Sequence, residues 1–274
     1  MPEGDTVWRT ARSLHEVLAG QELTRFDLRV PRHATADLAG RTVLEVVSRG
    51  KHILHRISDD DDRGGWTLQT HLKMDGSWHR YRRGTRWQRP EHTVRAVLET
   101  EQWQTVGYLL GVVDLVRTVD EGTVVGHLGP DLLGPDWDAG IAAANLAREP
   151  ATPIGMALLD QRNLAGLGTI YRAEVCFLRG LSPFLPAGEV DDPRALVVLA
   201  RRVIGANRDR VERTFTGSLL KDRYWVYGRE HEPCRRCGTA IRKAEFGPLT
   251  MERIVYWCPV CQPGDEPTSS PTVG

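Results

Sequence analysis

The first residues of the chain carry groups that could form a covalent bond with a sugar. Removal of Met1 would leave Pro2 as the first residue, with a secondary amine at its N-terminus. An α-amino group has a pKa of roughly 7.7–8, so a useful fraction is neutral and nucleophilic at physiological pH. Attack of this amine on a sugar C1′ would give an iminium, and Glu3 beside it could donate or accept a proton. Met-Pro termini also occur widely without such chemistry, so an inert terminus is the alternative.

Four of the five cysteines have the spacing of a metal site. They form two Cys-x2-Cys pairs, Cys234 with Cys237 and Cys258 with Cys261. Two such pairs complete the tetrahedral thiolate shell that zinc prefers, and a shell filled by protein has no open position for catalysis. We therefore predict one structural Zn²⁺. Two disulfides are the alternative, disfavoured for a chain without an export signal. Cys176 lies in an apolar segment and is expected in the core.

Two further segments could contact phosphate. Arg49-Gly50-Lys51 places a lysine at a predicted hairpin tip, where the glycine allows close approach of a ligand. Residues 164–171, which include Gly166 and Gly168, indicate a glycine turn leading into a helix, and N–H groups at such a helix start bind phosphate. Each segment alone has an ordinary structural explanation, a solvated lysine in one case and close packing of two helices in the other.

The apolar spacing in the first half predicts one helix followed by strands. The helix is expected to be capped by Asp5 and ended by Gly20, with apolar residues at helical spacing between them. A turn is expected at residues 48–50. Patterns of period two predict strands at residues 42–47, 52–57, 66–72 and 94–98. Several short strands of this kind favour a β-sandwich or barrel.

The second half is expected to be helical up to the cysteine pairs, after a composition change at Gly134-Pro135. Four helices are predicted: one capped by Asp138 and reaching Leu146, one with Pro153 at its first helical position, one at residues 170–178 ending at Gly180, and one opened by Asp192-Pro193 and reaching Val203. The segment between the cysteine pairs is basic and is expected to form a β-hairpin. The tail, residues 263–274, is expected to be disordered.

The composition excludes some classes of protein. The chain has 274 residues, and 36 basic and 36 acidic side chains give a formal net charge of zero. No apolar run approaches the roughly 18 residues of a membrane span, and the charged first twenty residues are not a signal peptide, so we expect a cytoplasmic protein. The zero charge argues at first sight against nucleic-acid binding. Charge is uneven, however: six arginines lie between Arg80 and Arg95, whereas acids gather at residues 59–62 and 114–149.

Taken together, the motifs resemble the formamidopyrimidine-DNA glycosylase/endonuclease VIII family, and its endonuclease VIII branch most. The resemblance runs from residue 1 to about residue 262. The matching motifs are Met1-Pro2-Glu3-Gly4, Arg49-Gly50-Lys51, His71-Leu72-Lys73-Met74-Asp75-Gly76-Ser77, His127-Leu128-Gly129-Pro130-Asp131, Gly166-Leu167-Gly168-Thr169-Ile170-Tyr171, Val226-Tyr227-Gly228-Arg229 and residues 253–262.

The resemblance implies an α+β multi-domain fold. It comprises an N-terminal β-sandwich with flanking helices at residues 1–133, a helix–two-turn–helix domain at 134–228, a zinc-ribbon β-hairpin at 229–262, and the tail at 263–274. It also implies a base-excision-repair glycosylase that removes oxidised bases and nicks the strand by β,δ-elimination. The implied partner is damaged DNA, and we expect a monomer with no small-molecule cofactor and no membrane contact.

The resemblance assigns roles residue by residue. Pro2 would be the nucleophile that forms the Schiff base, Glu3 the proton donor, Lys51 a contact to the lesion phosphate, and Arg253 a phosphate contact that serves the δ-elimination. Met74 would fill the space left by a flipped base, for which a core methionine is the alternative. The implied DNA-binding residues are Lys73, Met74, His127, Gly166, Gly168, Thr169, Tyr171 and Arg253.

Departures from the family pattern bear on the substrate. Thr169 replaces the Asn that follows Gly-x-Gly in much of the family, and Thr6 stands where a family carboxylate lies. Lys73 and His127 replace Gln and Arg of some endonuclease VIII sequences. The Arg-x-Phe wedge of the purine-lesion branch, expected between Val112 and Gly126, has no match. This absence favours oxidised pyrimidines as substrates.

Two other classes of function remain as alternatives. One is a non-catalytic lesion- or structure-specific DNA-binding protein on the same scaffold. The other is a zinc-ribbon adaptor between proteins, which would not need the N-terminal motif.

Overall fold

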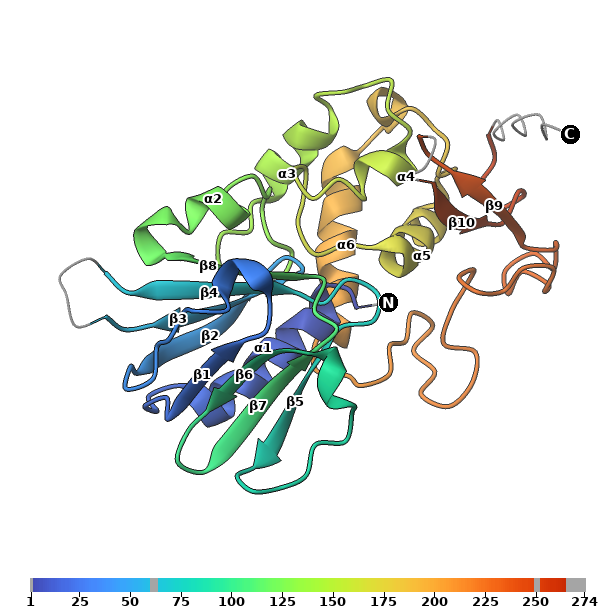
Figure 1. The fold of residues 1–274 in the computed structure, drawn as a ribbon. Helices are drawn as coiled ribbons and strands as arrows, with labels where there is room; N and C mark the ends of the chain where they lie inside the picture. The colour runs from blue at the N-terminus through green and yellow to red at the C-terminus, as the bar shows by residue number, and fades with distance from the viewer. Residues whose placement is uncertain (1, 60–63, 249–251, 265–274) are drawn as a thin grey trace, which may run out of the picture. The chain divides into compact units, whose positions relative to one another are not determined.

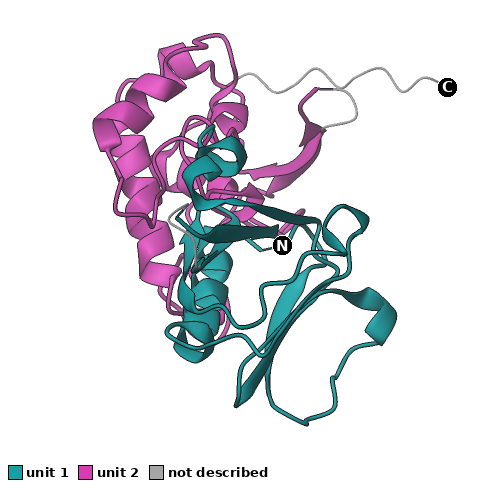
Figure 2. Cartoon of the chain, turned by 60° about the vertical axis from the view of Figure 1, so that its left-hand side comes forward, with its two compact units in different colours: residues 1–127 teal, residues 128–274 magenta. Residues whose placement is uncertain are grey.

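A computed structural model describes residues 2–59, 64–248 and 252–264 of the chain. The chain divides into two compact units, Met1–His127 and Leu128–Gly274, which are coloured separately in Figure 2. Residues 60–62 of the acidic run and residues 265–274 of the predicted disordered tail lie outside the described residues. Within the described residues, no helix has the length and apolar character needed to cross a bilayer.

The first unit is a β-sandwich of two antiparallel four-stranded sheets, labelled in Figure 1. One sheet has the order β1-β6-β7-β5 and the other the order β2-β3-β4-β8. The strands are β1 Arg25–Leu28, β2 Val43–Arg49, β3 His52–Ile57, β4 Trp66–His71, β5 Ser77–Arg82, β6 Val94–Glu99, β7 Trp103–Tyr108 and β8 Val112–Arg117. The helices are α1 Gly4–Leu18 and α2 Gly122–Val125, with 3-10 turns at η1 Pro31–His33, η2 Glu91–Thr93 and η3 Thr118–Asp120.

Helix α1 and both sheets share one apolar core. Leu14 of α1, Ile53 of β3 and Leu98 of β6 are all buried within it. The sequence predicted this helix and four of the strands, and the β-sandwich is confirmed. The sequence patterns did not predict β1, β5, β7 and β8. Three of these are sheet edges, where a polar outer face weakens the apolar alternation.

The predicted start of α1 was wrong by two residues. The helix begins at Gly4 with Glu3 at its N-cap position, and no side chain caps it. Asp5 is instead a fully buried acidic residue of the first turn, where the helix dipole favours negative charge. Gly20 lies beyond the helix end with φ 75°, and its N–H donates to Val43 O at 2.7 Å. That bond connects the helix end to β2.

The second unit contains helices followed by a two-stranded hairpin. Its elements are α3 Ala139–Leu146, α4 Ile154–Ala157, α5 Thr169–Arg179, η4 Ala187–Glu189, α6 Pro193–Asn207, β9 Arg242–Phe246 and β10 Arg253–Trp257. Two predicted caps are confirmed: Asp138 accepts from Ile141 N at 2.9 Å and Asp192 from Ala195 N at 2.8 Å. Gly180 ends α5 in the left-handed region. Pro153 occupies the N-cap of α4, one position before the predicted one.

The units divide between His127 and Leu128, a few residues before the expected division after residue 133. Hydrogen bonds explain this position. Gly129 N donates to Gln161 O at 2.9 Å, and Leu132 N donates to Ala165 O at 3.1 Å. These bonds attach residues 128–133 to the helical unit. The hairpin belongs to the same unit, because α5 and the cysteine segment share a small apolar cluster.

Candidate functional site: a reactive N-terminus, a lysine turn and a helix-borne hairpin

The N-terminal motif lies at the start of α1 in the first unit. Pro2 is partly exposed, whereas Glu3 is fully buried. The Glu3 carbonyl accepts the first helical bond, from Val7 N at 3.0 Å. The position of Pro2 is therefore fixed relative to the helix that follows it.

Lys51 lies in a two-residue hairpin turn between β2 and β3. Arg49 pairs with His52, so Gly50 and Lys51 alone form the turn. The predicted turn at residues 48–50 was displaced, because Ser48 and Arg49 belong to β2. Gly50 is buried with φ 58°, a left-handed conformation that favours glycine. The backbone therefore determines where Lys51 lies, and its side chain is half-buried.

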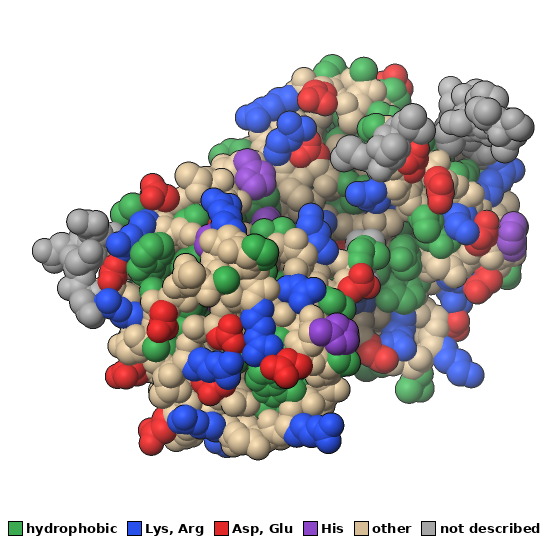
Figure 3. Space-filling view, in the orientation of Figure 1, with side chains coloured by type: hydrophobic (Ala, Val, Ile, Leu, Met, Phe, Trp, Pro, Cys, Tyr) green, Lys and Arg blue, Asp and Glu red, His purple; other side chains and the backbone are tan. Residues whose placement is uncertain are grey.

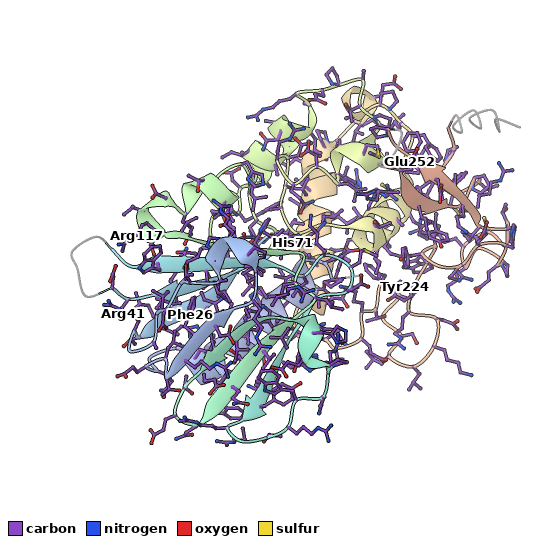
Figure 4. The ribbon with its side chains drawn as sticks, in the orientation of Figure 1. Phe26, Arg41, His71, Arg117, Tyr224 and Glu252 are labelled. Atoms are coloured by element: carbon purple, nitrogen blue, oxygen red, sulfur yellow. The ribbon has the colours of Figure 1, made fainter. Side chains whose placement is uncertain are left out.

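Three histidines at this end of the sheet were not among the predicted catalytic groups, although His127 was a predicted DNA contact. The rings of His52 and His71 are 4.9 Å apart, and that of His127 is 6.4 Å from His52. His71 is labelled in Figure 4 at the end of β4. His52 pairs with His71 across β3 and β4, a pairing that sequence spacing alone cannot reveal. The motif containing His71 was a signal for that residue only.

His52 and His71 are neutral at physiological pH. Burial lowers the pKa of His52 to about 4 and that of His71 to about 3, and the neighbouring histidine and lysine charges act in the same direction. Lys73 N donates to His71 Nδ1 at 2.9 Å, so the neutral ring carries its proton on Nε2. His71 can therefore donate a hydrogen bond without adding charge beside Lys51 and Lys73.

The turn after β4 presents Lys73 and Met74. Both are exposed, Met74 by 60%, which excludes the core-methionine alternative. Glycine is needed twice around this turn. A Cβ on Gly76 would lie 2.4 Å from Leu72 O, and one on Gly111 would overlap the Lys73 side chain. The turn is therefore closely packed beneath two exposed side chains.

The region between Val112 and Gly126, where the wedge was expected, consists of β8, η3 and α2. Val112–Arg117 forms β8, and the connection from β7 consists only of residues 109–111. Leu109 is an exposed apolar residue of this connection, and its φ is 47°. The described structure thus has no room for a long wedge-bearing loop at this point.

In the second unit, the glycine turn leads directly into α5. Gly166 has φ 106°, and Gly168 is the N-cap residue. Gln161 fixes the turn by accepting from Gly166 N and donating to Leu167 O, both at 3.0 Å. The turn is therefore positioned before the N-terminal end of an eleven-residue helix.

All four predicted DNA contacts of this segment are buried, Gly166 and Gly168 in the turn and Thr169 and Tyr171 in the helix. Thr169 is 6% exposed, and Tyr171 is fully buried with its ring 5.0 Å from that of Phe215. In this conformation Tyr171 presents no exposed surface to a ligand. Arg253, by contrast, is exposed in β10, and its Nη1 donates to Glu252 O at 2.9 Å.

The four paired cysteines form one cluster. Their sulfurs all lie within 4.8 Å of one another, with Cys234–Cys261 at 3.8 Å and Cys237–Cys258 at 3.5 Å. A disulfide would need about 2.05 Å, so the disulfide alternative is wrong. Metal–sulfur bonds of about 2.3 Å would place tetrahedral sulfurs about 3.8 Å apart, which fits this cluster. Cys176 is fully buried in the helical core, as predicted.

Basic and acidic side chains are interspersed on the face shown in Figure 3. Part of the arginine-rich segment has partners within the first unit: Arg80 pairs with Glu16 at 2.9 Å, and Arg82 lies 4.1 Å from the Trp103 ring centroid. The zero net charge comes from equal numbers of basic and acidic side chains, and some of the basic groups are paired locally.

Comparison with known proteins covers nearly the whole chain. A family model described as the formamidopyrimidine-DNA glycosylase N-terminal domain matches residues 1–114, and one described as the H2TH domain of the same enzyme matches residues 128–209. The chain is 53% identical over 270 residues to a probable endonuclease 8 2 of Streptomyces coelicolor, covering 97% of this chain and 96% of the relative. It is 48% identical over 263 residues to the DNA-(apurinic or apyrimidinic site) lyase Nei2 of Mycolicibacterium smegmatis, covering 96% and 99%.

Solved structures show the same fold. The Lactococcus lactis Fpg in complex with DNA containing N7-benzyl-Fapy-dG matches with a TM-score of 0.78, covering 96% of this chain and 100% of that one. The two sequences are 22% identical, so this likeness concerns the fold alone.

Proposed function

The chain belongs to the formamidopyrimidine-DNA glycosylase/endonuclease VIII family, and from this premise we propose that it is a bifunctional DNA glycosylase and AP lyase. The observation that carries the proposal is the N-terminal motif at the start of α1. Pro2 is partly exposed there, beside a fully buried carboxylate, in a chain 48% identical to a lyase acting on abasic sites.

In the proposed reaction, the Pro2 amine bonds to C1′ while the bond from C1′ to the base breaks and the base leaves with a proton. Glu3 supplies and removes protons at the sugar. The C1′–O4′ bond then breaks as O4′ takes a proton, which converts this adduct to an open-chain iminium. The iminium makes a C2′ proton acidic, and its loss expels the 3′ phosphate in the β-elimination. A second elimination expels the 5′ phosphate. Lys51 and Arg253 would stabilise the negative charge of the phosphates.

The substrate is damaged DNA in which the target base is flipped out of the helix, since C1′ is inaccessible while the base is stacked. Met74 supports this proposal because it is an exposed apolar side chain on a closely packed turn. The short connection at residues 109–111 supports oxidised pyrimidines rather than purines.

The cysteine cluster is proposed to bind one Zn²⁺ with a structural role. Cys234, Cys237, Cys258 and Cys261 would be its ligands, and the ion would supply a fixed junction between the ends of the β9–β10 hairpin segment. The four thiolates fill the tetrahedral shell, so the ion would leave no position for substrate.

Borohydride trapping tests the covalent step. The untagged protein should form a covalent complex with abasic-site DNA, and Pro2→Gly or an N-terminal tag should reduce trapping by roughly 100-fold or more. Robust trapping by a protein with a blocked N-terminus would overturn the assignment of Pro2. Salt-sensitive binding without nicking of any damaged oligonucleotide would instead favour the non-catalytic DNA-binding alternative.

A panel of oligonucleotides tests the substrate class. Thymine glycol and 5,6-dihydrouracil should be cut faster than 8-oxoguanine paired with cytosine. The reverse order would contradict the pyrimidine preference but leave the lyase proposal intact.

A further inference from the structure

Helix α5 carries two fully buried charged side chains. Arg172 and Glu174 both have no exposed surface. Charged residues are almost never fully buried unless hydrogen bonds compensate, because desolvation is costly. Their bonds therefore indicate what these two residues do in the second unit.

Glu174 binds the chain just before the first cysteine pair. Its carboxylate accepts backbone N–H groups from Trp225 at 2.9 Å, Val226 at 3.0 Å and Tyr227 at 2.9 Å. Three such bonds fix residues 225–227 against α5. Tyr224, labelled in Figure 4, immediately precedes this segment.

Arg172 binds the hairpin. Its Nη2 donates to the carbonyl oxygen of Ile254 in β10. Ile254 directly follows Arg253, which in turn follows Glu252, the residue labelled in Figure 4. The bond therefore fixes the backbone of β10 at Ile254, the residue next to Arg253, and connects it to helix α5.

The same helix begins at the glycine turn. Thr169 is its first residue and Arg172 lies three positions further, about one helical turn along the axis. The start of α5 and the backbone beside Arg253 are thus connected through one rigid turn of helix. Arg172 itself cannot touch a ligand in this conformation, since its side chain is fully buried.

We propose that Arg172 is a positioning residue for Arg253, setting the distance between the α5 glycine turn and the Arg253 guanidinium. This inference rests on the proposed function, in which Arg253 contacts phosphate, and on the phosphate contact that the sequence predicts for the turn. The proposal implies that the δ-elimination depends on a buried arginine that does not contact the DNA.

The hairpin has anchors besides Arg172. Phe184 packs edge-on against Phe246 of β9 and Trp257 of β10, with ring centroids 5.0 and 4.9 Å apart. The cysteine cluster closes the other side of the same segment. We therefore expect an Arg172 variant to keep its hairpin and its metal but to lose the exact placement of Arg253.

The test uses the full-length, metal-loaded protein and measures products on abasic-site DNA under single-turnover conditions. Arg172→Met should raise the ratio of β- to δ-elimination product about fivefold or more, in the direction of Arg253→Ala. Borohydride trapping, which depends on Pro2, should stay within about twofold of the parent. Arg172→Lys retains a donor and should give an intermediate ratio.

Arg229→Met is the matched control. Arg229 is also nearly buried and donates to backbone carbonyls, those of Trp225 at 2.7 Å and Pro233 at 2.9 Å, but not to β10. It should lower stability without changing the product ratio. Metal content of each variant shows whether the cysteine cluster is intact.

Three results would overturn the inference: a parental product ratio in Arg172→Met, an equal loss of trapping and δ-product, or the same ratio change in Arg229→Met. If Arg172→Met does not fold, Arg172→Lys decides, and a parental ratio in that variant counts against the inference. A parent protein that neither traps nor nicks abasic DNA would overturn the proposed function, and the inference with it.

Discussion

The two units position their functional groups by different means. In the first unit, Lys51 and Met74 lie on turns whose shape is set by the backbone, through Gly50 in the left-handed region and Gly76 against Leu72 O. In the second unit, side chains provide the positioning: the buried carboxylate of Glu174, the buried guanidinium of Arg172 and the clustered cysteine thiols.

This difference determines whether a variant can lose activity without losing stability. A functional side chain on a backbone-defined turn can be removed with little effect on the fold around it. Removing a buried polar group that binds several backbone atoms leaves those atoms without partners, so the surrounding segment must move. We therefore expect variants of the first unit to lose activity at constant stability, whereas variants of the second unit lose both.

Metal removal should have the largest effect and should act on the second unit. Chelation or Cys258→Ser should reduce nicking by about 100-fold or more, because a structural zinc of this kind contributes on the order of 10 kcal/mol to folding. Hydrogen exchange should increase in β10 but not in β4. Cys176→Ala, a buried cysteine outside the cluster, is the control and should keep its metal. Full nicking by metal-free protein would show that activity does not depend on the cysteine cluster of the second unit.

Lys51→Met should lower nicking on the order of 100-fold, the range typical for loss of one positioned catalytic side chain. Its free energy of unfolding should change by less than about 0.5 kcal/mol, since the backbone defines the turn. Gly50→Val is the informative partner variant. A branched residue at φ 58° should cost on the order of 1–3 kcal/mol. Equal destabilisation by the two variants would show that the lysine itself maintains the turn.

Met74→Ala should have a smaller and more selective effect. Excision of a paired lesion should fall about tenfold, as expected for losing an apolar group inserted into a helix, while cleavage of a preformed abasic site should stay within about twofold. Leu44, exposed by 57% in the same unit, provides the matched control Leu44→Ala. A similar loss on both substrates would mean that Met74 does not act in base flipping.

The same contrast explains what the sequence could predict. The cysteine pairs, the caps Asp138 and Asp192 and the lysine turn depend on residues close in sequence, and each was found. The β-sandwich followed from strands with clear alternation. Edge strands such as β8, with every residue only partly buried, give no such pattern.

Long-range pairings were not predictable. Arg172 lies 82 residues from Ile254, and Glu174 lies 51 residues from Trp225. Arg and Glu side chains are mostly exposed in proteins, so their residue types gave no sign of burial. The histidine cluster likewise depends on strand pairing between His52 and His71. The start of α1 was misplaced because Asp5 is a good capping residue by type, whereas the structure uses it inside the first turn.

Lowering the pH should destabilise the first unit more than the second. Of these predictions, this one involves the smallest change in activity at neutral pH. Eight of the nine histidines lie in the first unit, and only His231 lies in the second. His55 is fully buried, with its Nε2 lacking a partner among the described residues, and burial lowers its pKa to about 4. Its unfolded pKa is about 6.5, so the native state binds fewer protons between these values. The contribution of His55 is therefore fully present above pH 6.5 and lost as the pH falls towards 4.

The difference between the native and unfolded pKa of His55 corresponds to a loss on the order of 3 kcal/mol across this window. His55→Phe retains an aromatic ring next to Trp78, whose ring centroid lies 5.1 Å from that of His55. The unfolding free energy of this variant should fall less between pH 7 and 4.5 than that of the parent. Activity at pH 7.5 should change less than about twofold, because the ring is neutral there. His92→Gln, at an exposed position, should retain the parental pH dependence. Hydrogen exchange corrected for intrinsic rates should show β3 losing protection at higher pH than α5. The opposite order would mean that the second unit, despite having a single histidine, is the acid-sensitive one.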